Sequence, residues 1–135
     1  MALPTFLHQA NKAKQTEAKL FVGSMNRAQQ AYFVEKSSFT ISIDELGIGI
    51  NQQTNNYEYV SNVDPSGTIV TNNGRSLTGT LKSYVGVTYL NLVTIAGTQE
   101  TLTITILCES PAIGIGTLQT QTSTICPTDW ILLPI

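Results

Sequence analysis

The first quarter of the chain has the pattern of apolar and polar positions that is typical of a helix. Between Pro4 and Glu35 there is no further proline and one glycine, and Ala, Lys, Gln and Glu are frequent. These residue types favour helix, and Pro4 suits a helix start. We therefore predict a helix over about residues 4–35, roughly 45 Å long at 1.5 Å per residue.

Apolar side chains divide this helix into two halves. In the second half, Phe21, Met25, Ala28 and Tyr32 recur at spacings of four, three and four. This spacing forms one stripe, so we expect these four residues to pack against a sheet. The apolar residues of the first half are Leu3, Phe6, Leu7, Ala10 and Ala13. A small domain cannot cover the whole rod, and we expect these five to contact another subunit.

After Lys36 the composition changes to Thr, Ser, Asn, Gly and β-branched residues. We predict a connecting loop over about 36–56 and an antiparallel sheet over about 57–108. Strand candidates are 57–63, a short edge strand at 67–70, 85–93, and 101–108, which alternates most cleanly. Residues 64–67 and Asn72-Asn73-Gly74 have turn chemistry, and residues 94–99 suit a hairpin connection.

The chain closes on an apolar tail, Trp130-Ile131-Leu132-Leu133. Such a tail is expected to be buried, either on the sheet or in a contact between subunits. One long helix followed by an antiparallel sheet is an α+β arrangement. With 135 residues, we predict one α+β domain over 1–135.

Composition narrows the possible functions. Apolar residues make up 41% of the chain and charged residues 12%, which excludes a disordered, charge-rich tail. The net charge of −2 argues against a dedicated nucleic-acid binder, because phosphate binding needs clustered Lys and Arg.

Both cysteines, Cys108 and Cys126, lie in the last third. The surrounding Thr/Ser/Asn-rich sequence resembles that of exported proteins, and this favours a disulfide over two buried free thiols. Closing a loop of this size is worth about 3 kcal/mol in the chain-entropy model. No CxxC motif or Cys/His cluster indicates zinc.

Nothing in the sequence marks a catalytic or cofactor site. His8 is the only histidine, so a Ser-His-Asp or Cys-His site would have to use it, and its place near the helix start favours a solvated or subunit-contact role. Possible calcium ligands are Asp44, Glu45, Glu58 and Asp64. No EF-hand spacing links them, so we interpret them as surface and turn residues. We therefore predict neither an enzyme nor a cofactor.

The printed sequence shows neither the pattern of an export signal nor that of a membrane segment. No apolar run reaches the roughly 18–20 residues that span a bilayer. Met1 is followed almost directly by Pro4 and a polar helix pattern, which is not a signal peptide.

The segment Ala2-Leu3-Pro4-Thr5-Phe6-Leu7, continued by a polar stretch from Gln9 to Gln15, resembles the middle of a type IV pilin helix. Residues 17–19 and 23–33 are similar to cyanobacterial pilins in particular. So, in order, are residues 46–50, 56–59, 81–86 and 107–109.

This resemblance implies a long N-terminal helix, a loop, an antiparallel sheet and a C-terminal region fastened by a Cys108–Cys126 disulfide, with an apolar tail to residue 135. It also implies that Met1 is an engineered start, in a soluble form that lacks the leader and the N-terminal membrane helix. In the family the mature chain begins with Phe, which is methylated. We expect the native subunit to sit in the inner membrane through that helix before assembly.

The function that the resemblance implies is structural. The subunit would join a homo-oligomeric or mixed filament on the cell surface, built by the pilus assembly machinery, for motility, adhesion or DNA uptake. Two alternatives stay open. One is a pseudopilin of a type II secretion system. The other is a minor pilin that binds DNA or a surface ligand, although the loops contain little Lys or Arg.

Overall fold

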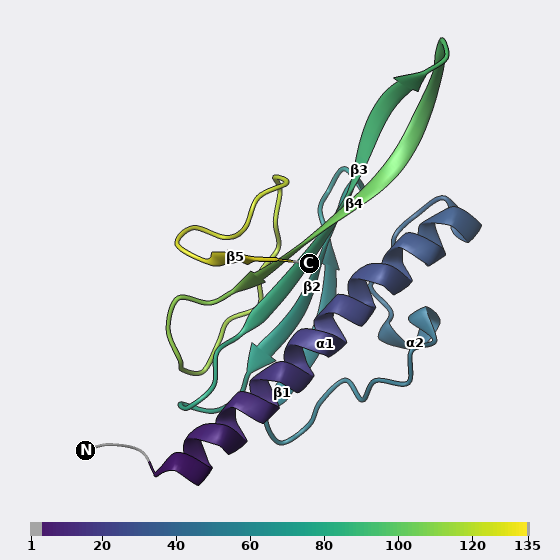
Figure 1. Ribbon diagram of the computed structural model, residues 1–135. Helices are drawn as coiled ribbons and strands as arrows, with labels where there is room; N and C mark the ends of the chain where they lie inside the picture. The colour runs from purple at the N-terminus through teal and green to yellow at the C-terminus, as the bar shows by residue number, and fades with distance from the viewer. Residues whose placement is uncertain (1–3, 135) are drawn as a thin grey trace.

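The computed structural model describes residues 4–134 and shows a long helix lying across one face of a sheet (Figure 1). Its elements are α1 (Thr5–Lys36), α2 (Ile43–Leu46), β1 (Tyr57–Val63), β2 (Ile69–Ser76), β3 (Tyr84–Ile95), β4 (Thr98–Glu109) and β5 (Ile131–Leu133). The strands follow one another in the order β1-β2-β3-β4-β5, and every neighbouring pair is antiparallel. The predicted α+β class, with a long N-terminal helix on an antiparallel sheet, is confirmed.

Helix α1 begins after Pro4, whose φ of −54° suits a helix start. It ends at Ser37, which adopts the left-handed conformation with φ of 59°. The N–H of Ser37 then donates to the carbonyl of Phe33 at 2.8 Å. This is a left-handed cap that satisfies a carbonyl of the last turn.

The connection after α1 contains the short helix α2, which we did not predict. The hydroxyl of Ser42 accepts a hydrogen bond from the N–H of Glu45 at 3.3 Å and so caps its start. Gly47 ends it in the left-handed conformation. Ile43 is buried in the core, so this single turn fastens the connection to the domain.

Two predictions for residues 67–74 are wrong, because these residues belong largely to strand β2. It is not an edge strand over 67–70 but an eight-residue strand between β1 and β3. Asn72-Asn73-Gly74 is not a turn but the middle of this strand, and Asn72 lies opposite Gly86 of β3. The physical reason is that neighbouring strand residues face opposite sides of a sheet. Each asparagine finds hydrogen-bond partners on its own side, so a polar pair fits in an interior strand.

Strands β3 and β4 form the predicted hairpin. The turn is Ala96-Gly97, with φ of 51° and 79°, and Ile95 lies opposite Thr98. Positive φ at both central residues is the mark of a type I′ turn. Pairing with β2 stops at Tyr89, so the hairpin continues past the sheet as a two-stranded projection, clearly visible in Figure 1. We call residues 91–102 the arm.

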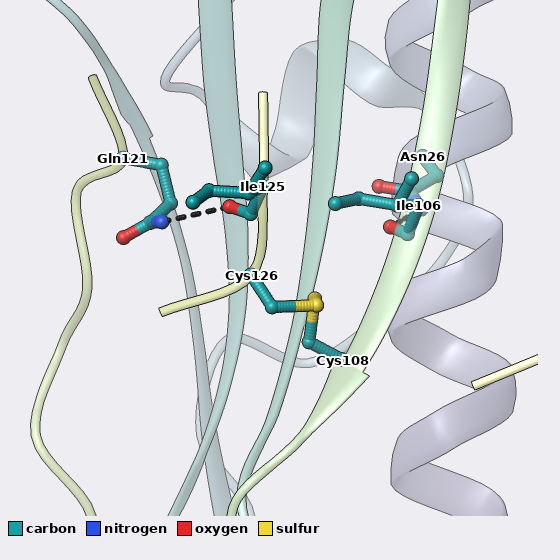
Figure 2. The surroundings of a disulfide bond; sticks show 6 residues. All are labelled: Asn26, Ile106, Cys108, Gln121, Ile125 and Cys126. Carbon is teal, nitrogen blue, oxygen red and sulfur yellow. Dashed lines mark hydrogen bonds between the residues drawn. A yellow bond between two sulfur atoms is a disulfide. The ribbon is translucent and has the colours of Figure 1, made fainter. Parts of the chain in front are cut away.

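Residues 110–130, between β4 and β5, form a segment without strands that we call the C-terminal segment. It lies against the sheet face opposite α1. The N–H of Gln119 donates to the side chain of Asn73, and the N–H of Gln121 to that of Thr71, both at 2.8 Å. The disulfide between Cys108 of β4 and Cys126 is confirmed (Figure 2). It ties this segment to the sheet.

The apolar tail reaches the sheet but is not buried there. As β5, it pairs with the end of β4, with Leu132 opposite Cys108. Ile131 and Leu132 stay exposed in the single chain, so burial on the sheet is wrong for these two residues. A three-residue edge strand is anchored mainly by its backbone; the side chain of Leu133 packs against the core, whereas those of Ile131 and Leu132 have no layer above them. A subunit contact there stays a prediction.

Candidate functional site

The face that α1 turns to the sheet consists of Ala18, Val22, Met25, Asn26 and Gln29. Of the four residues predicted to form the core stripe, Met25 is fully buried there. The other three lie beside this face. Phe21 is half-buried against Tyr59, with ring centroids 5.5 Å apart. Ala28 and Tyr32 are half-buried, and the hydroxyl of Tyr32 donates to Glu45 of α2 at 2.9 Å.

Asn26 is the main polar contact between the helix and the sheet. Its Nδ2 donates to the carbonyl of Ile106 on β4 at 3.1 Å. Its Oδ1 accepts from Asn72 Nδ2 at 2.9 Å and from Thr88 Oγ1 at 3.2 Å. One side chain therefore joins α1 to β2, β3 and β4. A buried amide is tolerated because all of its groups are paired.

Gln29 extends this network by one turn. Its Nε2 donates to the carbonyl of Thr40 at 2.7 Å and to Asn72 Oδ1 at 3.3 Å. Its Oε1 accepts from the N–H of Thr40 at 3.1 Å. Among the residues that the structure describes, no buried side-chain polar atom lacks a partner. The network fixes both the position and the rotation of α1 on the sheet.

Two glycines on the strands let the helix come this close. A Cβ on Gly86 would overlap the side-chain amide of Asn26. A Cβ on Gly74 would lie 2.8 Å from a methyl group of Val22. Sequence reasoning missed this set of amides and glycines, because the helix stripe was assigned from apolar residues alone. The available signal was the spacing of Val22, Asn26 and Gln29, which repeats every three to four residues.

The first half of α1 is not packed against the sheet, since the buried residues of the helix begin at Ala18. Its first hydrogen bond to the rest of the domain is made by Gln15, whose Oε1 accepts from the N–H of Lys82 at 3.0 Å. Before that point Phe6 is 70% exposed and Leu7 is 42% exposed. Ala10 and Ala13 are exposed too, whereas Leu3 lies outside the described residues. A projecting, partly apolar helix end is a surface suited to packing against other helices.

Two grooves flank α1. The first, of about 360 Å³, lies between the helix and the end of β4, and its lining includes Lys19, Leu20, Arg27, Leu107 and Pro134. The second, of about 510 Å³, lies beside the first half of the helix. We call it the His8 groove; it is lined by His8, Asn11, Lys12, Gln15, Thr80, Lys82 and Ile113. Neither groove gathers the nucleophile, base and orienting group of a catalytic site.

The acidic residues considered as calcium ligands are dispersed. Glu58 pairs with Arg75 at 2.8 Å, and Asp44 and Glu45 lie on α2. Asp64 organises the β1–β2 turn by accepting from the N–H groups of Thr68 and Ile69 at 3.0 Å. Within residues 4–134, no three His, Cys, Asp or Glu side chains lie together in a way that could hold a metal ion.

The pKa of Asp64 shows the effect of these bonds. Burial by itself raises the pKa of the carboxyl, but hydrogen bonds from Ser66, Ile69 and Thr68 outweigh it and lower the pKa below its ordinary value. Asp64 is therefore ionised at neutral pH, and its carboxylate holds the β1–β2 turn through these hydrogen bonds.

Tyr57, Tyr59 and Tyr84 of the strands belong to the core. Burial raises the pKa values of Tyr57, Tyr59 and Tyr84 above the ordinary value, so all three stay neutral. The hydroxyl of Tyr84 donates to Glu109 at 2.8 Å, and that of Tyr57 to the carbonyl of Lys82 at 2.7 Å. These rings pack inside the domain and are not available as a stacking surface.

In the described part of the chain, no helix combines the length and apolarity that crossing a bilayer requires.

Comparison with known proteins places the chain in a family. The family model described as type IV pilin-like G and H matches residues 15–128. No curated protein and no solved structure matches the chain. The matched region runs from Gln15, which hydrogen-bonds to Lys82, to just beyond Cys126, and so includes the helix face, strands β1 to β4 and the disulfide. The chain belongs to this type IV pilin-like family, and its long helix, antiparallel sheet and C-terminal disulfide are those of a structural pilin-like protein.

Proposed function

We propose that this protein is a filament subunit of a type IV pilus and catalyses nothing. The observation that carries the proposal is the division of α1 at Gln15. Beyond it the helix is held to the sheet by buried amides, whereas before it Phe6, Leu7, Ala10 and Ala13 are presented to the outside. Exposed apolar side chains on a projecting helix gain free energy by packing against other helices.

In this proposal, the helix ends of neighbouring subunits pack together along the filament axis and the sheets face outward. The subunit partners are copies of this chain or related pilins, added by the pilus assembly machinery at the inner membrane. The finished filament lies on the cell surface, where it serves motility, adhesion or DNA uptake.

The experiment is immunogold electron microscopy of the source cells with antibody against this chain, combined with deletion of its gene. Surface filaments should be labelled, and the deletion should remove the label. Phe6→Ser together with Leu7→Ser should reduce labelled filaments strongly. The matched control is Val34→Ser, which changes an exposed apolar residue near the other end of α1 and should leave filament number unchanged.

Two results would contradict the proposal. One is the absence of label from surface filaments in cells that make the protein. The other is a deletion strain with normal pili and defective protein secretion, which would assign the chain to a secretion pseudopilus.

A further inference from the structure

We propose that the arm of one subunit inserts into the His8 groove of the next copy of this chain, so that subunits connect end to end along the filament. The inference rests on the proposed filament function and names the outward-facing contact that accompanies helix packing. It starts from three features: the exposed arm, its single acid, and a basic groove at the opposite end of the molecule.

The arm exposes apolar surface without a covering layer. Beyond Tyr89, no strand within residues 4–134 flanks the hairpin on the β2 side. Ile95 is 55% exposed, and Leu92 and Leu102 are exposed as well. An isolated two-stranded ribbon is marginally stable in water, so a long one that exposes apolar side chains is a candidate for coverage by a partner.

The strand register gathers Val93, Ile95 and Leu102 on one face of the arm, whereas Leu92 lies on the other face. Val93 lies opposite Glu100, Ile95 opposite Thr98, and Leu102 opposite Asn91. Directly opposed residues share a face in an antiparallel pair, so Val93, Ile95 and Leu102 surround Glu100 on one side. Thr88 and Gly86 have the other parity and face α1, which places the Glu100 side on the sheet face away from the helix. Glu100 is the only charged residue in the arm.

The His8 groove offers the complementary chemistry. It combines the basic side chains of Lys12 and Lys82 with the exposed apolar side chain of Ile113. Lys82 also pairs with Glu109 at 3.4 Å, whereas Lys12 makes no ion pair within residues 4–134, so Lys12 is the cation most open to a new partner. A groove of about 510 Å³ is large enough to hold a tight turn with a few flanking side chains.

The position of the two surfaces decides which partner is meant. The arm projects beyond one end of the molecule, past the last turns of α1 (Figure 1). The His8 groove is lined by residues of the first turns of the helix, near the opposite end. An arm cannot reach the groove of its own chain. Two different patches at opposite ends make a heterologous contact, which generates an open filament when the rotation from copy to copy does not close into a ring. A second copy of this chain therefore supplies a partner whose arm matches the groove in charge, size and direction.

Charge exchange tests this contact. Filaments would be isolated from cells whose only copy of the gene carries a photo-crosslinking amino acid in place of Ile95. Irradiation should give a dimer whose crosslinked peptides map to residues 8–15, 80–82 or 113. Glu100→Lys alone, and Lys12→Glu alone, should each lower the dimer yield about fivefold, because each places like charges in contact. The two changes in one chain should restore the yield.

Glu35→Lys is the matched control, since it makes the same charge change on an exposed residue outside the arm and should leave the yield unchanged. Labelled filaments whose crosslinks map elsewhere, or whose double variant is not restored, would overturn the arm contact and leave the filament function standing. Cells in which this chain enters no filament would overturn both.

Discussion

The side-chain amide of Asn26 occupies the space in which a Cβ atom on Gly86 would lie. Helix α1 and strand β3 therefore approach closely at one point, where the amide also reaches Asn72, Thr88 and the backbone of β4. This point fixes where α1 lies on the sheet and so how its first half projects.

Gly86→Ala should therefore destabilise the domain by about 1–3 kcal/mol, the usual cost of overpacking a tight interior. Chemical denaturation monitored by circular dichroism measures this loss. Gly79→Ala is the control, because a Cβ there meets nothing within 4 Å, and it should change stability by less than about 0.5 kcal/mol. Equal effects of the two changes would show that the close approach is unimportant.

Asn26→Ala should destabilise the domain through lost hydrogen bonds. It leaves the buried polar groups of Asn72 and Thr88 without their shared acceptor, and each orphaned group costs about 1–3 kcal/mol. The neighbouring Arg27 lies on the exposed side of α1, so Arg27→Ala should cost far less. Combining Asn26→Ala with Gly86→Ala should cost less than the sum of the two, because the amide that clashes is gone. An additive double variant would contradict the contact.

Ala96 is the weak position of the hairpin turn. It adopts φ of 51°, whereas the first position of a type I′ turn favours Asn or Gly. Ala96→Asn should stabilise the protein by roughly 0.5–1 kcal/mol, with the gain confined to the arm. Amide hydrogen exchange of residues 92–101 should slow. Gly97→Ala, at φ of 79°, should do the reverse.

The Cys108–Cys126 disulfide should contribute about 3 kcal/mol, since it closes a loop with a sequence separation of 18. The double variant Cys108→Ser and Cys126→Ser should unfold at lower denaturant concentration by this amount. It should also be cut faster by protease between residues 111 and 125, because Gln119 and Gln121 then hold the segment by hydrogen bonds alone. Unchanged protease sensitivity would mean that those bonds suffice.

Asp64 should make stability fall in acid. Its pKa is lowered in the folded state, so its contribution is fully present above the ordinary carboxyl pKa near 3.8 and is lost as the pH falls through the lower folded value. The stability difference between the natural protein and Asp64→Asn should therefore be constant from pH 7 to about 5 and shrink toward pH 2. A difference that grows in acid would mean that the sign is wrong.

The sequence by itself determined the elements whose signals are local. A long run of helix formers after Pro4 predicted α1, and the alternation from Thr101 to Cys108 predicted β4. Two cysteines in an export-like composition predicted the disulfide. Each of these depends on neighbouring residues or on a count, so one chain is enough to show it.

Only the tertiary structure decided the rest. Asn72-Asn73-Gly74 has the local chemistry of a turn, but Asn72 is satisfied by α1 and Asn73 by the C-terminal segment, so the chain stays extended there. The helix face was assigned from apolar residues alone, whereas its buried side includes Asn26 and Gln29. Buried amides become favourable only when partners distant in sequence meet them, and no local pattern can show that meeting.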